Sequence, residues 1–167
     1  SEDESGERFG ASVDIEGDWL VASASANDLS SFVDAGAVYI FKRQTDNTWV
    51  ETQMLQPDED NGDPITLQTG DRFGADLAMF GDIIVIGSPY RDRGGNNAAG
   101  STYIYKYNTG IDTWELIQDI SGPTSDADEP QSHFGSSVTI FGRYLAVAAE
   151  DRTVGSYSRA GKVYIYK

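Results

Sequence analysis

Short apolar and alternating stretches follow one another along this chain in a fixed order. Residues 11–15 alternate polar and apolar side chains, which is the period-two pattern of a strand with one buried face. Residues 19–23 open with a solid apolar run, typical of a strand that is covered on both faces. Residues 37–42 and 49–55 are rich in aromatic and β-branched side chains, which favour strands. The pattern predicts four short strands and no helix.

The same four-strand pattern returns along the chain, and its marker residues keep their spacing. A Phe-Gly pair begins each copy, and a glycine follows eight residues after the Phe. The glycine of an Ala-Gly pair comes 27 residues after the Phe, and a tyrosine comes three residues later. The markers are Phe9-Gly10, Gly17, Ala35-Gly36 and Tyr39; then Phe73-Gly74, Gly81, Ala99-Gly100 and Tyr103; then Phe134-Gly135, Gly142, Ala160-Gly161 and Tyr164. Because this register is undisturbed, the chain is an array of one unit, divided into residues 1–72, 73–133 and 134–167.

Units of four antiparallel strands at this spacing predict an all-β fold made of β-propeller blades. A β-sandwich would not account for three units in fixed register. The chain opens inside a stretch that matches the linker before Phe73, and it stops directly after the third strand of the third unit. Closed propellers have four to eight blades. We therefore expect further blades, or a symmetric partner, to complete the ring; two copies would supply six blades.

These markers make the chain similar to FG-GAP repeat proteins, the repeat of the integrin α-subunit propeller, in its short, cysteine-poor form. The two halves that name the repeat are Phe73-Gly74 and Gly87-Ser88-Pro89. The resemblance implies an extracellular or cell-surface protein whose rim loops bind a protein or glycan partner. Integrin-type blades carry a calcium loop between their first two strands. The connection here is only Glu16-Gly17-Asp18 or its equivalent, so that calcium site is not carried over.

Charge narrows the classes of partner. The chain has 27 acidic against 12 basic residues and a net charge of −15, which argues against nucleic acid and against anionic membrane surfaces. Its apolar runs are far too short to insert into a bilayer. Without cysteine the chain has no disulfide and no thiolate metal site. Calcium remains a candidate cofactor, because the linkers between units place carboxylates close together: Asp58, Asp60 and Asp63, and then Asp126 and Asp128. The alternative is that these acids only solvate the linkers.

Aromatic and basic residues in the loops between the second and third strands are the candidates for partner binding. They are Phe32, Tyr90, Arg91, Arg93 and Tyr157. Aromatic loop residues can stack on sugars or anchor a protein partner. The alternative is that they pack against neighbouring loops.

Nothing in the sequence points to catalysis. His133 is the single histidine and occupies the position of Arg8 and Arg72 in the other units, which indicates a structural role. No nucleophile elbow, P-loop or zinc-protease motif is present. We therefore expect no enzyme activity. A purely architectural role, as a spacer or subunit of an extracellular filament or coat, is the main alternative to binding. A propeller-type hydrolase with paired carboxylates is a weaker one.

Overall fold

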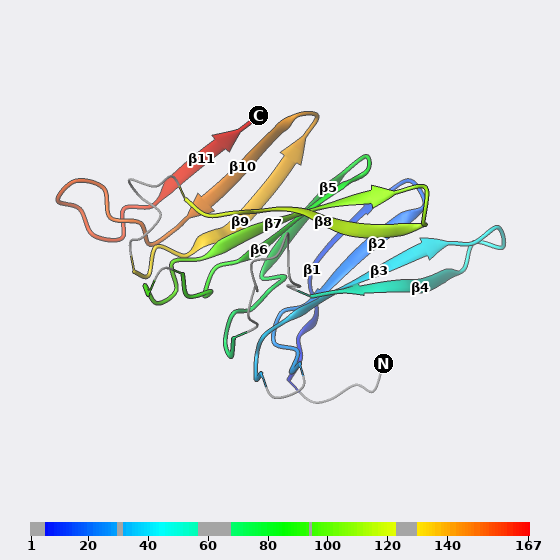
Figure 1. Cartoon of the computed structure of the whole chain (residues 1–167), viewed down its shortest axis with the longest axis horizontal. Coiled ribbons are helices and arrows are strands. Elements are labelled where there is room, and N and C mark those ends of the chain that lie inside the picture. The colour runs from blue at the N-terminus through cyan, green and yellow to red at the C-terminus, as the bar shows by residue number, and fades with distance from the viewer. Residues whose placement is uncertain (1–5, 30–31, 57–67, 94, 123–129) are drawn as a thin grey trace.

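A computed structural model of the chain describes residues 6–29, 32–56, 68–93, 95–122 and 130–167. All eleven elements in this described part are strands, and they form three separate antiparallel sheets in chain order (Figure 1). The all-β prediction is therefore confirmed, and the sheets have the arrangement of propeller blades. Below, the sheets are called blades 1, 2 and 3.

Each blade is a meander in which every strand pairs with the next one along the chain. Blade 1 contains β1 (Phe9–Glu16), β2 (Trp19–Ala24), β3 (Ala37–Arg43) and β4 (Trp49–Leu55). Blade 2 contains β5 (Asp76–Phe80), β6 (Ile83–Ser88), β7 (Ser101–Asn108) and β8 (Thr113–Ile120). Blade 3 contains, among the described residues, β9 (Phe134–Phe141), β10 (Tyr144–Ala149) and β11 (Lys162–Tyr166). These bounds agree closely with the strands predicted from the hydrophobic pattern.

The glycine eight residues after each Phe forms the turn of the first hairpin. Gly17, Gly81 and Gly142 have φ values of 61°, 60° and 60°, in the left-handed region that glycine adopts without steric cost. Each begins a two-residue connection, so that Glu16 pairs with Trp19 and Phe80 with Ile83. Two-residue turns of this hand match the twist of the strands they join.

The blades stand side by side and bury apolar side chains between them (Figure 1). The first strands of neighbouring blades touch, β1 with β5 and β5 with β9. Between blades 1 and 2 the core includes Val38, Ile40, Phe73 and Tyr103, all fully buried. A second cluster around Phe134 and Val147 joins blades 2 and 3. Each blade therefore buries apolar surface against its neighbour as well as within its own sheet.

A backbone seam joins the Phe-Gly pair of one blade to the Ala-Gly pair of the blade before it. The Phe73 N–H donates to the Ala35 carbonyl at 2.9 Å, and the Phe134 N–H donates to the Ala99 carbonyl at 3.1 Å. A Cβ at Gly36 would overlap the carbonyl oxygen of Phe73, so only glycine fits there. The two markers recur together in the sequence because they are the two sides of one contact.

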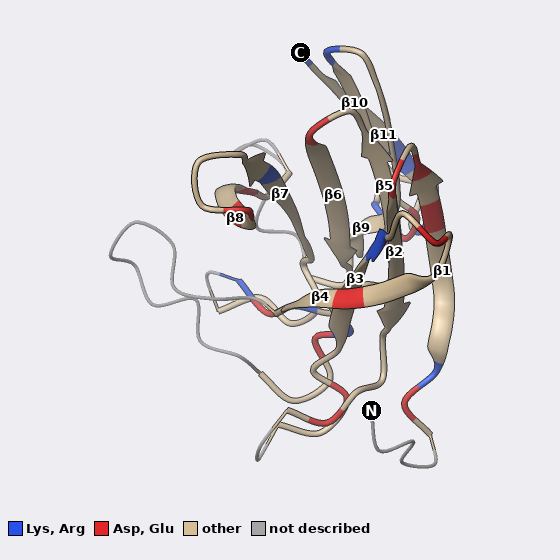
Figure 2. Cartoon of the chain, turned by 90° about the vertical axis from the view of Figure 1, so that its right-hand side faces the viewer, with Lys and Arg blue, Asp and Glu red and all other residues tan. Residues whose placement is uncertain are grey.

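Acidic side chains on the first strands also bridge the blades. Asp14 accepts a hydrogen bond from the Met79 N–H at 2.8 Å, and Glu16 accepts one from the Gly81 N–H at 2.7 Å. Between the next two blades Asp76 accepts from the Val138 N–H at 2.9 Å. Figure 2 shows acidic positions as red bands on β1. Part of the negative charge therefore binds backbone donors within the fold.

Because Phe9, Phe73 and Phe134 hold the same position in the repeat, the sequence predicts that all three are buried between blades, and this prediction is wrong for Phe9. Phe73 and Phe134 are 0% and 2% exposed, whereas Phe9 is 56% exposed. The Phe9 ring packs edge-on against Tyr39 and Phe41 of its own blade, and no described blade covers its outer face. Val13 and Ile15 on the same strand are exposed for the same reason. We call this surface of Phe9, Val13 and Ile15 the leading face.

We predict that Phe73→Ala lowers the free energy of unfolding by about 3–5 kcal/mol, the range for truncating a buried phenylalanine. The matched change Phe9→Ala should cost about 1 kcal/mol or less, because most of that ring already contacts solvent. Urea unfolding of the two variants and the wild type measures both values. Equal losses at the two positions would contradict the inter-blade packing described here.

Candidate functional site at the loop end

The long loops between the second and third strands of each blade lie at one end of the molecule. They span residues 25–36, 89–100 and 150–161, at the end opposite the first-hairpin turns (Figure 1). The described ends of the linkers contact them, since the Gly70 N–H donates to the Val33 carbonyl and the Gln131 N–H to the Asn97 carbonyl. We call this surface the loop end. It gathers side chains from all three blades.

Each long loop is closed by the same set of internal contacts. A short bridge joins Leu29 to Phe32, Arg93 to Asn96 and Val154 to Tyr157. At the base of each loop the N–H of the Ala-Gly glycine donates back across it at 2.9–3.0 Å, to Asn27, Arg91 or Arg152. A residue with positive φ recurs just before that base, at Asp34, Ala98 and Arg159. The recurrence of this strained position in all three blades indicates loops of one defined shape.

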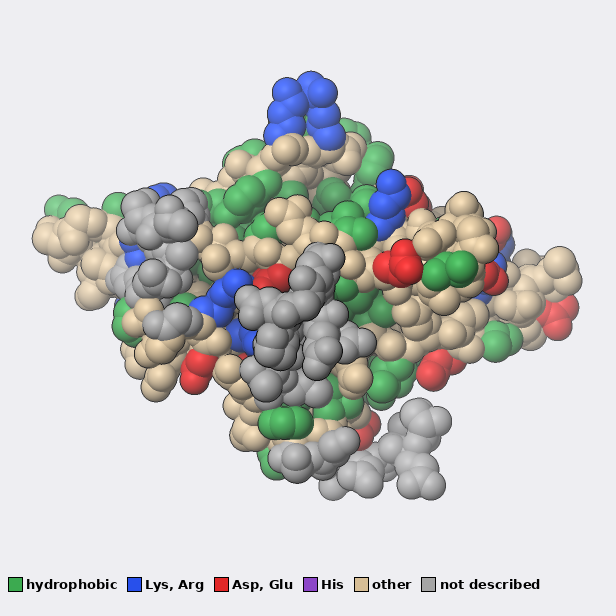
Figure 3. Space-filling model, viewed as in Figure 1, with side chains coloured by type: hydrophobic (Ala, Val, Ile, Leu, Met, Phe, Trp, Pro, Cys, Tyr) green, Lys and Arg blue, Asp and Glu red, His purple; other side chains and the backbone are tan. Residues whose placement is uncertain are grey.

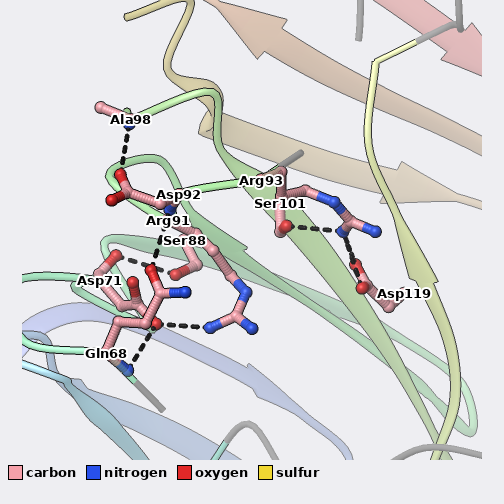
Figure 4. A network of polar contacts seen from close by, with 9 residues as sticks. All are labelled: Gln68, Asp71, Ser88, Arg91, Asp92, Arg93, Ala98, Ser101 and Asp119. Atoms are coloured by element: carbon pink, nitrogen blue, oxygen red, sulfur yellow. Dashed lines mark hydrogen bonds and ion pairs between the residues drawn. The ribbon is translucent and has the colours of Figure 1, made fainter. Parts of the chain in front are cut away.

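A buried ion pair fastens the second loop to the linker in front of blade 2 (Figure 4). The Arg91 guanidinium donates to Asp71 Oδ2 at 2.6 Å, and the two side chains are 8% and 1% exposed. The Gln68 N–H donates to the same carboxylate, and the Ser88 hydroxyl donates to the Asp71 carbonyl at 2.8 Å. Arg91 is thus committed to the interior, so its side chain is not presented to a partner at the surface.

Burial is the largest influence on the pKa of the Asp71 carboxyl group. Removal from water raises the pKa of this carboxyl from 3.8 to about 6, although the Arg91 guanidinium and the Gln68 N–H act in the opposite direction. Its second oxygen, Oδ1, is buried and accepts no hydrogen bond from the described residues. The ion pair therefore fixes the loop while leaving one carboxylate oxygen uncompensated.

The same clamp occurs in blade 1 with other residue types. Asn27 occupies the position of Arg91, and its Nδ2 donates to Glu7 Oε1 at 2.9 Å. Sequence reasoning missed Asp71 and Glu7 as partners of the loops. The signal was present, because a polar residue stands two positions before each Phe-Gly pair.

Two other predicted candidates are also engaged within the loops. Arg93 donates to Ser101 and to both oxygens of Asp119 at 2.7–2.8 Å, which leaves about a third of its side chain exposed (Figure 4). Phe32 is half-buried against a small cluster that includes Leu29 and Ala35. These two side chains mainly brace the loops from inside.

Tyr157 and Tyr90 are the predicted candidates that face solvent. Tyr157 is 75% exposed at the tip of the third loop, and Tyr90 is 38% exposed. The Tyr90 ring lies 4.8 Å from the His133 ring, and the Arg72 guanidinium stands over it at 4.9 Å. These contacts hold the Tyr90 ring in one orientation at the boundary of blades 2 and 3.

His133 is held by an acidic partner from the third loop. Its Nδ1 lies 3.1 Å from Asp151 Oδ2, and Arg159 donates to Asp151 Oδ1 at 2.7 Å. The hydrogen bond from Arg159 lowers the pKa of Asp151, which keeps this carboxylate charged. The ring of His133 thus joins the entrance of blade 3 to its loop, as a structural residue would.

The calcium prediction rests on residues outside the described ranges. Asp58, Asp60, Asp63, Asp126 and Asp128 all lie in the undescribed parts of the linkers. Within the described part no three His, Asp or Glu side chains are grouped closely enough to hold a metal ion. Calcium binding by the linkers therefore stays a prediction.

Charged and hydrophobic side chains are not segregated into separate patches on the face shown in Figure 3. In Figure 3 acidic, basic and hydrophobic side chains are interspersed over the face shown. No helix long and apolar enough to cross a membrane occurs among the described residues.

The burial of Asp71 generates a pH-dependent prediction. Because the folded-state pKa is raised, Asp71 stabilises the fold most when protonated, and this contribution is lost as pH rises from about 4 through about 6. The stability of the wild type relative to Asp71→Asn should therefore fall by about 2–3 kcal/mol between pH 4 and pH 7. Urea unfolding at several pH values measures this difference. Asp82→Asn is the control, because Asp82 forms an exposed ion pair with Lys106. The stability of the wild type relative to this variant should change by less than about 0.5 kcal/mol between pH 4 and pH 7. A flat profile for the Asp71 pair would contradict the prediction.

Comparison with known protein families agrees with this geometry. The model of the FG-GAP repeat matches residues 1–41 and 67–105. The two ranges end within β3 and β7, the third strands of the first and second units. The unit from Phe134 repeats the same marker residues in register. A comparison with curated proteins finds none that matches the chain. With its Phe-Gly and Ala-Gly seams and its three propeller-like blades, the chain is an FG-GAP repeat protein.

Proposed function

We propose that this chain is a non-catalytic binding module of an extracellular or cell-surface protein, which presents its loop end to a protein or glycan partner. The observation that carries the proposal is the exposure of Tyr157 and Tyr90 on loops whose own shape is fixed by internal contacts. The FG-GAP repeats support the propeller-like scaffold on which these loops stand.

Tyrosine is well suited to a binding surface that is already ordered before the partner binds. Its ring offers a large apolar area with few rotatable bonds, and its hydroxyl can exchange hydrogen bonds with sugar or peptide groups. Because the loops are already braced, binding orders little new structure, which reduces its entropic cost. The predominantly acidic composition favours a neutral or basic partner surface over an anionic one.

The polar groups of the loop end support a binding role over a catalytic one. The buried pair of Asp71 and Arg91 faces the interior of a loop base, and His133 is engaged with Asp151 and Tyr90. Each of these groups joins a loop to a linker or a blade entrance. Their contacts are explained by the positioning of the loops.

The wild-type chain should bind one class of ligand on combined glycan and protein arrays, and Tyr157→Ala should weaken that binding at least about tenfold. The matched control is Phe141→Ala, because Phe141 is 77% exposed in the same blade but lies at the opposite end. The control should leave binding unchanged. Equal loss in both variants, or no ligand on either array, would count against a binding module.

An architectural role is the second candidate, and the exposed leading face favours it. Phe9, Val13 and Ile15 occupy the positions that Phe73, Leu77 and Met79 bury against blade 1. The opposite face of blade 3 likewise exposes Val163 and Ile165, at the positions where blade 1 buries Val38 and Ile40. The buried interfaces inside the chain are therefore templates for head-to-tail contact between copies, and two copies closing both contacts would form a six-bladed ring.

If this assembly forms, sedimentation equilibrium should show concentration-dependent dimers of the 167-residue chain. Ile15→Asp should shift the protein to monomer, because an unpaired carboxylate would be buried in the contact. The control Ile111→Asp changes an exposed turn residue away from both open faces and should leave the dimer intact. A monomeric wild type at all concentrations would exclude this candidate.

A further inference from the structure

In blades 2 and 3 the residue before the Phe-Gly pair contacts the side chain that follows it eighteen positions later, at the start of the long loop. In blade 3 these residues are His133 and Asp151, whose Nδ1 and Oδ2 atoms lie 3.1 Å apart. In blade 2 the same two positions hold Arg72 and Tyr90, and the guanidinium stands over the ring at 4.9 Å. A tyrosine therefore occupies, in blade 2, the place of the carboxylate that binds the basic residue in blade 3.

The Arg72 guanidinium has no carboxylate partner among the described residues, although the chain is rich in acids. Other arginines do have one, because Arg43, Arg91, Arg93 and Arg159 each bind an aspartate. A guanidinium that rests on an aromatic face keeps its N–H donors in its own plane, where they match the two oxygens of a carboxylate. The donors of Arg72 are thus available to a group from outside the chain.

Arg72 and Tyr90 are both held in place before any ligand binds. The Arg72 backbone has a φ of 51°, and its N–H donates to the Asp34 carbonyl of the first loop at 3.1 Å. The Tyr90 ring lies 4.8 Å from the His133 ring of the next blade. Because contacts from three blades fix this pair, a ligand would not have to order it, and the entropic cost of binding is small.

The neighbouring exposed groups favour a sugar over a protein surface. Asn97 and Gln131 carry exposed side-chain amides, and the Gln131 N–H donates to the Asn97 carbonyl at 2.8 Å, two residues before His133. Amide side chains donate and accept hydrogen bonds, as sugar hydroxyls do. A protein partner normally requires an apolar centre that loses its water. Tyr90 offers little of this, since it is only 38% exposed.

We propose that Arg72 and Tyr90 form a binding site for the carboxylate of a uronic acid in an otherwise neutral oligosaccharide. The Arg72 guanidinium donates two N–H groups to this carboxylate, and Asn97 and Gln131 exchange hydrogen bonds with neighbouring sugar hydroxyls. A single carboxylate suits the site better than a polyanion, which the net charge of −15 would repel. The inference rests on the proposed binding role of the loop end and names the class of its ligand.

Isothermal titration of the intact chain with paired trisaccharides tests the carboxylate. Each probe links one glucuronic or galacturonic acid to two neutral sugars, and its control is the same trisaccharide with the carboxyl group reduced to an alcohol. At least one acidic probe should bind saturably, and its reduced form should bind at least about tenfold more weakly, because a charge-assisted contact is lost. This comparison uses the wild type alone, so it does not depend on how a substitution affects folding.

Substitutions of Arg72 test whether this residue reads the carboxylate. Arg72→Gln should weaken binding of the acidic trisaccharide at least about tenfold and should abolish the preference over the reduced form. Arg72→Lys should give an intermediate loss, because lysine keeps the charge but not the paired donors. The matched control is Arg143→Gln, since Arg143 stands over the Tyr144 ring at 5.8 Å but lies at the opposite end. The control should leave binding unchanged.

Three outcomes would overturn the proposal. The first is that every acidic trisaccharide binds no better than its reduced form. The second is an equal loss of binding in Arg72→Gln and Arg143→Gln. The third is that a short peptide with one aspartate binds through Arg72 while no acidic trisaccharide binds, which would indicate a protein partner. A ligand whose binding requires Tyr157 but not Arg72 would exclude this site and still support the proposed function.

Discussion

The contact between the Phe-Gly pair of one blade and the Ala-Gly pair of the blade before it determines the rest of the structure. There two backbones approach so closely that neither Gly36 nor Gly100 could carry a Cβ. The phenylalanine ring beside each seam enters the apolar layer between sheets, so one short segment fixes both the backbone spacing and the core. Without this approach each four-stranded sheet would expose a whole apolar face.

The loop end depends on the same seam. Backbone bonds from Arg72 to Asp34 and from His133 to Ala98 join the start of one blade to the loop of the previous blade. Both Arg72 and His133 adopt positive φ values of 51° and 53°, a conformation that persists where surrounding contacts determine it. The shapes of the first two loops are therefore set by two blades at once. This coupling is why Tyr90, on the second loop, stands on a firm support between blades 2 and 3.

Two apolar faces are exposed among the described residues. They are the leading face and the face of β11 with Val163 and Ile165. Both surfaces are apolar for the reason that their buried equivalents are. The acidic residues of the first strands also join the blades, since their carboxylates accept hydrogen bonds from backbone N–H groups of the next blade.

The sequence by itself determined the repeat, the strand positions and the sites of the turns, because hydrophobic period and turn glycines are local properties. It also marked the loop residues Tyr90 and Tyr157 as candidates. Only the tertiary structure decided that Phe9 is exposed while Phe73 is buried, although the two occupy the same position in the repeat. It likewise placed Arg91 against Asp71, twenty residues away, and the His133 ring against Tyr90 of the blade before it. Burial and pairing of this kind depend on what the neighbouring blade supplies, and no pattern within one repeat contains that information.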